Sequence, residues 1–488
     1  MDADDLARHL GLWSAAKGTL QQKLTHALMQ AIRNGALNPG LRLPSERALA
    51  QSLTLSRTTV MSAYDALREA GWVESRTGSG TRVAERSRAV AAARGSAQAG
   101  ALAASPLLGM LATREDEDVL DLALGSPLAL RCLPLDLFTL PPDEYAALMQ
   151  DRFYYPLGLP PLRQAIAAYY CAAGVPTQAE QVLVTNGAQQ AIALTAALFV
   201  QRGDSVLVED PAYFGALDVF RAAGARIAPL RVESDGVSPS MLRDRIVATA
   251  ARLVYLTPTF QNPTGAVMPR AARREVGRIA AEFGVPVVDD GVLGDIVLEG
   301  SPPAPIAGHA AEAPVISIGS ISKLITPGLR VGWIRAAEPV IERLARVKSV
   351  TDLGSALITQ AIAVRLVGVV DEAKRLRRLE LKPRRDLLAR LLAEHLPEWK
   401  FRAPTGGVFL WVELPAGDAR EFAQTALRRG VVIVPGPIMS ASEQHARFIR
   451  LPFLAEEPAM RTGVRRLAGA WREYRSGAQG RPQSLGMV

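Results

Sequence analysis

Cysteine and histidine are scarce in this sequence of 488 residues, which has two cysteines, Cys132 and Cys171, and five histidines. Two cysteines cannot build a disulfide framework, and neither belongs to a Cys/His metal-binding spacing. We therefore expect no metal site and a chain that works in the reducing cytoplasm. The first 13 residues contain three aspartates and no apolar run, so we expect no secretory signal.

Long apolar runs are also missing. The most apolar stretch, residues 191–200, has about half the length of a membrane-spanning helix, so we expect a buried helix there and no contact with a membrane. Apolar residues make up 49% and charged residues 21% of the chain, which is typical of a globular protein. The chain is too long for one hydrophobic core, and we expect two or three domains.

The net charge of +8 is distributed unevenly. Residues 14–83 contain nine lysines or arginines against four aspartates or glutamates, a surplus of +5. This surplus favours a polyanionic partner, although a solvated surface would explain the charge alone equally well. Residues 84–117, rich in Ala, Arg, Ser and Gly, are typical of a linker. The predicted domains are thus residues 14–83 and 118–477, joined by residues 84–117.

Residues 14–83 have clear helix and turn signals. Leucines and Ile32 recur at helical spacing in the first part, and Ser45 and Ser56 are suited to cap the next two helices. The pattern predicts helices ending near 34, through 53 and over 57–70, then short strands at 72–75 and 81–83 around a tip at 77–80. This order is a winged helix-turn-helix, whose third helix would enter the major groove of double-stranded DNA.

The same segment resembles the DNA-binding domain of GntR-family regulators. The words that carry the resemblance are LPSERALAQ at 43–51, SRTTVMSAYDALREAGW at 56–72 and SRTGSGTRV at 75–83. Arg57 can bind guanine or a phosphate, and the sequence leaves both open. The residues expected to contact DNA are Arg47, Arg57, Thr58, Thr59, Ser62, Arg76 and Arg82.

The body of the chain alternates apolar, β-rich runs with helical stretches. The runs are QVLVT at 181–185, SVLVE at 205–209, RLVYLTP at 252–258, VPVVDD at 285–290 and VISIGS at 315–320. Because these runs are apolar on both faces, they predict a mostly parallel central sheet covered by helices, which is the α/β class.

The strongest chemical signal is SISK at 320–323, followed by PGLRVG at 327–332. A neutral lysine directly after an apolar strand can condense with an aldehyde cofactor, which makes Lys323 the candidate. Ser320, Ser322 and Arg330 can converge on a phosphate, for which the guanidinium fork is suited. By itself, the pattern would also fit a surface lysine in a serine-rich loop.

Other strand ends carry matching residues. TNGAQQ at 185–190 offers the free N–H groups of a helix N-terminus to a phosphate, or is an ordinary helical turn. Tyr213 can stack on an aromatic ring or belong to the core. Asn262 can hold a phenolic oxygen.

Charged groups complete the pattern. Asp289 and Asp290 end an apolar strand, where a carboxylate is costly unless a partner such as a protonated pyridine nitrogen faces it. Arg450 lies in a predicted strand, RFIRL at 447–451, and can bind a substrate carboxylate.

Together with GLPPLR at 158–163 and PTGGVFLW at 404–411, these motifs resemble the fold-type I aminotransferases of pyridoxal 5′-phosphate over residues 119–475. The resemblance implies an internal aldimine at Lys323 and an Asp290 that keeps the ring nitrogen protonated, so that the cofactor is an electron sink. It implies cofactor contacts from Ala188, Gln189, Tyr213, Asn262, Asp290, Ser320, Ser322, Lys323 and Arg330, and a substrate contact from Arg450.

The sequence departs from that family at two places. Leu293 stands where the family has a tyrosine that hydrogen-bonds the ring hydroxyl, which puts efficient transamination in doubt. Phe153, with Tyr154 beside it, stands where the family has a tyrosine that reaches the neighbouring subunit's phosphate.

A GntR-type domain linked to an aminotransferase-like body resembles the MocR/GabR group of transcription regulators. The resemblance implies a pyridoxal phosphate-dependent regulator that senses an amino acid, an amine or the cofactor itself, and a head-to-tail homodimer. The alternative is a working aminotransferase for amino acids and 2-oxo acids. An enzyme of acyl-transfer type fits less well, because Arg450 and the NPTG segment look transaminase-like.

Overall fold

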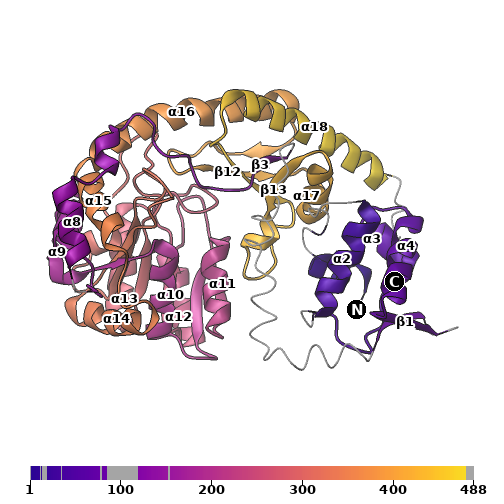
Figure 1. The fold of residues 1–488 in the computed structure, drawn as a ribbon, viewed down its shortest axis with the longest axis horizontal. Coiled ribbons are helices and arrows are strands. Elements are labelled where there is room, and N and C mark those ends of the chain that lie inside the picture. Colours follow the sequence, from indigo (N-terminus) through magenta and orange to yellow (C-terminus); the bar gives the residue numbers. More distant parts are fainter. Residues whose placement is uncertain are drawn as a thin grey trace.

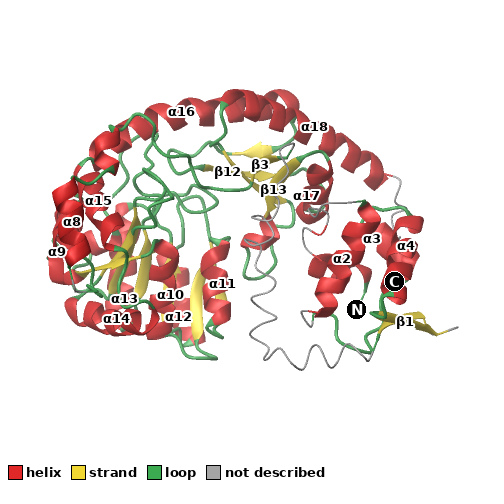
Figure 2. Ribbon diagram, viewed as in Figure 1, coloured by secondary structure: helices red, strands yellow, loops and turns green. Residues whose placement is uncertain are grey.

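The computed structural model describes residues 2–10, 13, 19–33, 36–76, 80–84, 119–151 and 154–479 (Figure 1). The predicted linker, apart from residue 84, and the wing tip at 77–79 lie outside the described residues, as does Phe153. Helices, strands and loops of the described part are distinguished in Figure 2.

The N-terminal part is a winged helix-turn-helix, as predicted. It consists of α1 (Ala3–Leu10), α2 (Leu20–Arg33), α3 (Glu46–Ser52), α4 (Arg57–Glu69), β1 (Val73–Arg76) and β2 (Gly80–Val83). The Ser45 hydroxyl accepts from the Ala48 N–H at 3.2 Å and the Ser56 hydroxyl from the Thr59 N–H at 3.1 Å. Each serine thus satisfies an N–H group that a helix start leaves without a partner.

Helix α1 lies ahead of residue 14, the predicted start of this domain, yet it packs into the same apolar core. Leu6, Leu10 and Trp13 are buried together with leucines of α2 to α4. The Ser52 hydroxyl at the end of α3 donates to the Asp4 carboxylate at 2.7 Å and fixes α1 in place.

The body contains a seven-stranded sheet in the order β4-β10-β9-β8-β7-β5-β6. Its strands are β4 (Val182–Thr185), β5 (Ser205–Asp210), β6 (Arg226–Arg231), β7 (Leu253–Leu256), β8 (Val287–Asp290), β9 (Val315–Ser320) and β10 (Gly332–Arg335). Only β10 is antiparallel to its neighbours. The carboxyl ends of the parallel strands therefore meet along one edge, where ligands of such sheets bind.

Helices accompany these strands in sequence, as expected of an α/β fold. They are α8 (Pro142–Gln150), α9 (Pro160–Ala172), α10 (Ala188–Phe199), α11 (Phe214–Ala222), α12 (Pro239–Thr249), α13 (Arg270–Phe283), α14 (Glu338–Thr351) and α15 (Leu357–Gly368), with 3-10 turns η4 (Leu135–Phe138), η5 (Ala179–Gln181) and η6 (Ile306–Gly308). The apolar stretch at 191–200 forms most of α10, as predicted. No helix within the described ranges is long and apolar enough to cross a membrane.

A smaller sheet, in the order β11-β12-β14-β13-β3, forms the C-terminal part of the body. Its elements are β3 (Leu120–Leu122), β11 (Lys400–Phe401), β12 (Phe409–Glu413), β13 (Val431–Pro435) and β14 (Phe448–Pro452), with η7 (Gly436–Met439), α16 (Val370–His395), α17 (Ala419–Arg428) and α18 (Glu457–Gln479). Figure 1 shows the long helix α16 arching from the large sheet to the smaller one. The smaller sheet brings Arg450 of β14 toward the edge of the large sheet.

Candidate functional site

Lys323 lies in the turn that follows β9, at the carboxyl edge of the large sheet. Its Nζ donates a hydrogen bond to the Ser126 Oγ at 3.1 Å. Burial, together with the nearby Arg450 and Arg330 cations, lowers the pKa of Lys323 to about 8, against the opposing effect of the Asp290 carboxylate. A large share of this amine is therefore neutral near pH 8, the form that attacks an aldehyde.

Asp290 and Asp289 end β8 and point to opposite faces of the sheet. Asp290 accepts from the Tyr255 hydroxyl at 2.5 Å and from the Val292 N–H at 3.1 Å. Asp289 accepts from the Ile306 N–H at 2.8 Å, away from Lys323. Burial raises the pKa of Asp290 even though its two hydrogen bonds lower it. A cation placed against Asp290 would relieve this cost.

Tyr255 is a site residue that the sequence analysis missed. It lies on β7, is fully buried, and holds the Asp290 carboxylate from one side. The only signal in the sequence is one polar side chain within the apolar run LVYL at 253–256.

The start of α10 is a turn whose geometry suits an anion. Gly187 takes a positive φ of 82° at the N-cap, and the N–H groups of Ala188 and Gln189 follow it, in the first turn of the helix. The Arg330 Nη2 donates to the Asn186 carbonyl oxygen at 3.2 Å. A Cβ on Gly187 would lie 2.6 Å from this guanidinium, so only glycine lets the arginine approach the turn.

The two serines of the SISK segment adjoin the same turn. The Ser320 hydroxyl donates to the Ser322 Oγ at 2.9 Å, and both side chains are buried. Ser320 pairs with Gly332 of β10, whose Cβ position would lie 2.9 Å from the Ala188 nitrogen. Hydroxyls, a guanidinium and a helix N-terminus thus share one small region, which suits a phosphate dianion.

A network of charged and polar side chains holds this turn in place. Asp352 accepts from the Asn186 Nδ2 at 2.9 Å and the Gln190 Nε2 at 2.7 Å. The ammonium group of Lys348, a fully buried side chain, donates to the other Asp352 oxygen at 2.6 Å. Asp352 thereby fixes the residues on both sides of the Gly187 turn, a role that the sequence analysis did not predict.

Tyr213 lies between β5 and α11, with its ring against the backbone of Gly215. A Cβ on Gly215 would lie 2.5 Å from the Tyr213 hydroxyl, and the Gln189 Nε2 donates to the Gly215 carbonyl at 2.9 Å. Burial, followed by the effect of Asp290, raises the pKa of Tyr213 to about 12. The phenol is therefore neutral and its ring is held by backbone on one face.

Arg450 and Asn262 lie together on the side of the smaller sheet. The Arg450 Nη1 donates to the Asn262 Oδ1 at 3.3 Å and the Nη2 to the Ala123 carbonyl at 2.7 Å. The guanidinium carbon lies 4.1 Å from the centre of the Phe409 ring and 5.5 Å from that of Phe214. Burial lowers the pKa of Arg450 to about 9, and its Nε is buried without a partner.

These groups fit an aromatic aldehyde that carries a phosphate. The unpartnered Nε of Arg450 is a buried donor that a ligand with an acceptor group would satisfy. The lysine, the carboxylate of Asp290 and the Gly187 turn converge at one sheet edge. Leu293 is buried in the apolar core and supplies no polar group to this region.

The residues predicted to contact DNA lie mostly on the surface of α3 and α4. Arg57 is 70% exposed and pairs with Glu46 at 3.4 Å. The hydroxyls of Thr58 and Thr59 each lie 2.8 Å from the Ser56 Oγ, so both take part in capping α4. Arg47 and Ser62 are exposed.

The arginines of the wing differ from one another. Arg82 donates to the Gly40 carbonyl at 3.1 Å and is half-buried. The side chain of Arg76 lies outside the described part of the chain. Arg42, which the sequence analysis missed, is exposed, and its backbone forms an antiparallel β-bridge with that of Arg82 at the base of the wing. Its guanidinium lies beside Gly80, where a Cβ would come within 3.1 Å.

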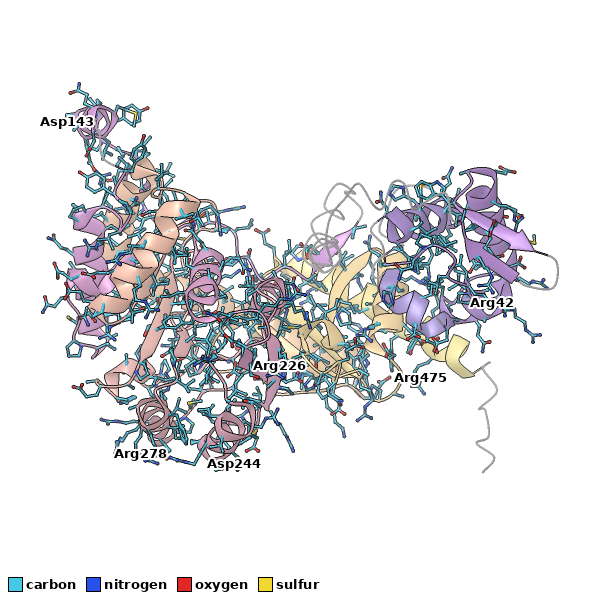
Figure 3. The ribbon with its side chains drawn as sticks, turned by 90° about the horizontal axis from the view of Figure 1, so that it is seen from below. Arg42, Asp143, Arg226, Asp244, Arg278 and Arg475 are labelled. Carbon is cyan, nitrogen blue, oxygen red and sulfur yellow. The ribbon has the colours of Figure 1, made fainter. Side chains whose placement is uncertain are left out.

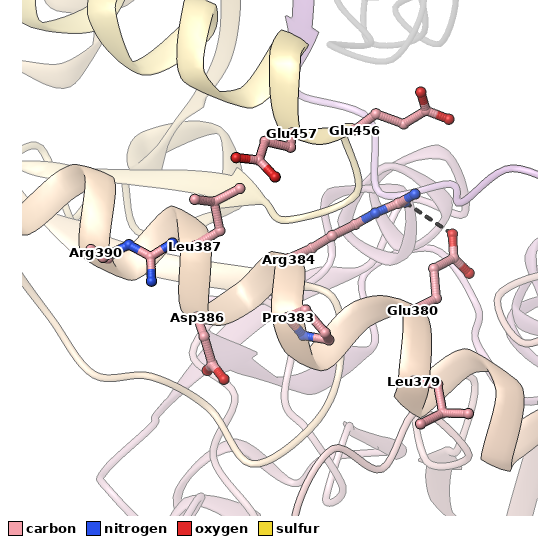
Figure 4. Close-up of a pocket in the computed structure, with 9 residues that line it drawn as sticks. All are labelled: Leu379, Glu380, Pro383, Arg384, Asp386, Leu387, Arg390, Glu456 and Glu457. Atoms are coloured by element: carbon pink, nitrogen blue, oxygen red, sulfur yellow. Dashed lines mark ion pairs between the residues drawn. The ribbon is translucent and has the colours of Figure 1, made fainter.

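A surface groove between α16 and the start of α18 is lined by none of these residues (Figure 4). Its charges have both signs and are partly neutralised within the groove. Arg384 pairs with Glu380 at 2.9 Å and donates to the Leu454 carbonyl at 2.7 Å. The groove therefore has a mixed lining that does not select for a ligand of one charge.

Comparison with known proteins identifies both parts of the chain. The family model of aminotransferase class I and II matches residues 118–467, and that of bacterial regulatory proteins of the gntR family matches residues 20–83. These matches agree with the predicted fold and resemblance.

Individual relatives have the same two parts or the body alone. The probable rhizopine catabolism regulatory protein MocR of Rhizobium meliloti is 32% identical over 78% of this chain and 78% of its own length. The uncharacterized HTH-type transcriptional regulator YdfD of Bacillus subtilis is 29% identical over 88% of this chain and 92% of its own. The structure of LysN, an alpha-aminoadipate aminotransferase from Thermus thermophilus complexed with N-(5′-phosphopyridoxyl)-L-leucine, superposes with a TM-score of 0.71. It is 28% identical, and the match covers 79% of this chain and 98% of that one.

Proposed function

Because the chain belongs to the aminotransferase class I and II family and carries a GntR-type helix-turn-helix domain in front of it, we propose that it is a transcription regulator that binds pyridoxal phosphate. In this proposal it senses an amino acid, an amine or the cofactor itself, and its DNA-binding domain responds. The observation that carries the proposal is the position of Lys323 directly after β9, at the sheet edge where Asp290 ends β8 and the Gly187 turn begins α10.

Each polar group of the cofactor has a proposed partner in this chain. The amine of Lys323 would bond to the aldehyde carbon with loss of water, and Asp290 would hold the proton on the ring nitrogen. When bound, the cofactor supplies an electron sink for the carbon attached to the ligand's nitrogen. The remaining contacts are proposed for the ring at Tyr213 and Asn262, for the phosphate at Ala188, Gln189, Ser320, Ser322 and Arg330, and for a ligand carboxylate at Arg450.

The proposed DNA contacts are those of α4 and the wing, namely Arg47, Arg57, Thr58, Thr59, Ser62, Arg76 and Arg82. Arg42 extends this set because it is exposed beside the wing. An exposed basic surface at the start of a recognition helix fits the DNA backbone and the base edges. The same proposal places the protein in the cytoplasm, with the DNA.

The proposal includes a head-to-tail homodimer. Val350 is 89% and Leu353 51% exposed at the end of α14, and Tyr154 next to this turn is 69% exposed. Figure 3 shows α8, marked by Asp143, standing out from the neighbouring helices, and its Tyr145 and Met149 are also exposed. Exposed apolar side chains such as these favour a second copy of the chain as their partner.

The test is DNA binding by the full chain. We expect salt-sensitive, sequence-selective binding to the DNA upstream of its own gene, changed in affinity by pyridoxal phosphate and by amines. A Lys323→Ala variant should lose the visible absorption of bound cofactor and its response to amines, whereas Lys382→Ala, at a partly exposed lysine of α16, should keep both. Selective binding that is absent under every condition would contradict the proposal.

An aminotransferase is the second candidate function, because Lys323, Asp290 and Arg450 are all present at the site. Leu293 argues against it, since the position offers no hydroxyl to the ring. Steady-state assays with amino acids and 2-oxo acids separate the two candidates. Many turnovers at ordinary enzyme rates would favour the aminotransferase, and a single half-reaction that stalls would favour the regulator.

A further inference from the structure

Ser126 is the side chain that receives the hydrogen bond of Lys323, and no motif in the sequence singled it out. The two residues are 197 positions apart, and the Nζ–Oγ distance is 3.1 Å. Ser126 is exposed beside Lys323. Because its hydroxyl can hydrogen-bond to solvent, it requires no other partner in the protein.

A rigid frame holds the two residues opposite each other. The Leu130 N–H donates to the Ile325 carbonyl at 3.0 Å, which joins the Ser126 segment to the Lys323 turn. Arg377 of α16, a fully buried arginine, spans both segments. Its Nη2 donates to the carbonyls of Leu128 and Ile325, each at 3.1 Å, and its Nε to that of Leu324 at 2.9 Å.

The residues before Ser126 connect it to Arg450. A Cβ on Gly125 would overlap the Phe409 ring, and that ring stacks on the Arg450 guanidinium at 4.1 Å. The Ala123 carbonyl accepts from the same guanidinium. The segment 123–126 therefore runs from the proposed carboxylate site to the amine of Lys323, along the space that a bound amino acid would occupy.

We propose that Ser126 is a positioning residue that stabilises the free amine of Lys323. The inference rests on the proposed function. The hydroxyl can accept from the ammonium form or donate to the lone pair of the neutral form. In both cases the hydrogen bond stabilises the Lys323 amine in the state that is not bonded to an aldehyde. It therefore slows the attack of this amine on an aldehyde. Ser126 would thus lower the retention of the cofactor on Lys323 and ease the exchange of Lys323 for an incoming amine.

The first test needs no cofactor. In the cofactor-free full-length protein near pH 8, the rate at which fluorodinitrobenzene modifies Lys323 is read by peptide mass spectrometry. Ser126→Ala should raise this rate about two- to tenfold, the factor that corresponds to one hydrogen bond, while Ser126→Thr, which keeps a hydroxyl, should stay near the wild-type rate. The rate at the partly exposed Lys382 serves as the internal reference.

The second test uses pyridoxal phosphate and an amine. Ser126→Ala should bind the cofactor about two- to tenfold more tightly in an absorbance titration. It should also need more of an amino acid, by a similar factor, to displace Lys323. Unchanged modification rates and unchanged titrations in Ser126→Ala would overturn the inference.

The two tests separate this inference from the proposed function. If pyridoxal phosphate never bonds to Lys323, the proposed function fails, but the modification rate still reports on the Ser126 contact. If Ser126→Ala behaves as wild type while the cofactor binds and DNA binding responds, only the role of Ser126 is wrong.

Discussion

The amine of Lys323 lies among two cations, Arg450 and Arg330, and one anion, Asp290. The cations and burial act in the same direction, so the Asp290 carboxylate does not restore the ordinary pKa of a lysine. This balance makes the lysine a nucleophile at moderate pH without a separate general base. It also makes the uptake of the cofactor depend on pH.

The rate of cofactor uptake should follow the titration of Lys323. The pKa of Lys323 is lowered from 10.5 to about 8, so the neutral amine becomes scarcer as the pH falls below 8. We expect the rate of pyridoxal phosphate uptake to rise about tenfold per pH unit up to about pH 8 and then to level off. Stopped-flow absorbance measures the rate, and a rise that continues to the range of an ordinary lysine would contradict the lowered pKa.

At the level of residues, the sequence predicted the groups that follow strands of the large sheet. The carboxyl ends of parallel strands share an edge, so Ala188, Asp290 and Lys323 had to approach one another once the strands were recognised. Tyr255 and Ser126 were missed because each acts across segments far apart in sequence. No local pattern reveals such a contact.

Helix α4 has its exposed arginine at the end that a recognition helix presents to DNA. Arg57 is paired with Glu46 of α3, and this exposed pair is weak and easily exchanged for a contact with DNA. The N-terminal domain can therefore be tested independently of the cofactor.

We predict that Arg57→Ala weakens DNA binding and leaves the spectrum of bound cofactor unchanged. If Arg57 contacts a guanine, its loss should cost about 1–3 kcal/mol of binding free energy and relax specificity at one base pair. If it contacts a phosphate, its loss should reduce the slope of log K against log salt concentration by about one. Fluorescence anisotropy at several salt concentrations distinguishes the two. The matched control is Arg68→Ala in the last turn of α4, where Arg68 pairs with Asp65. If Arg57→Ala and the wild type bind DNA with equal affinity, the assignment of α4 as the recognition helix is wrong.

The turn from α14 to α15 contains Asp352, and replacing this residue should weaken cofactor binding. In Asp352→Asn the buried Lys348 ammonium loses its anionic partner, and the Asn186 and Gln190 side chains lose a shared acceptor. Removing one member of such a pair is costly, and we expect a lower melting temperature together with at least tenfold weaker cofactor binding. Calorimetry and absorbance titration measure these, with Asp371→Asn, at a fully exposed residue of α16, as the control. Cofactor affinity equal to wild type would show that the turn holds its shape without Asp352.

The elements themselves were predicted unevenly. The buried strands β4, β5, β7, β8 and β9 were all recognised, because each is an apolar run bounded by polar residues. The strand β6 was not singled out, since it lies at the edge of the sheet, is partly exposed and contains Pro229. The strand β10 has four residues and begins with Gly332, so neither its length nor its antiparallel direction was evident from the sequence.

In the whole molecule, the exposed apolar end of α14 lies next to Asp352, which holds Asn186 and Gln190 around the Gly187 turn. Contact with a second copy at Val350 and Leu353 would therefore act directly on the proposed cofactor site. This proximity links the proposed dimer to the proposed sensor.

We predict that the double variant Val350→Asp, Leu353→Asp is a monomer at micromolar concentration and binds a two-half-site DNA at least tenfold more weakly. Two charges buried at an interface have no partner there, while the fold keeps both residues on its surface. Analytical ultracentrifugation and anisotropy measure the outcome. Val247→Asp, at a residue of α12 that is also exposed, should remain a dimer, and a dimeric double variant would place the interface elsewhere.

Arg450 already has neighbours on three sides, since a carbonyl, an amide oxygen and two aromatic rings surround its guanidinium, while its Nε faces none of them. A ligand that carries a carboxylate would satisfy this last donor, and a ligand that carries only an amine would leave it unsatisfied. If Arg450 binds ligands as proposed, decarboxylated amines should bind, but each more weakly than its parent amino acid.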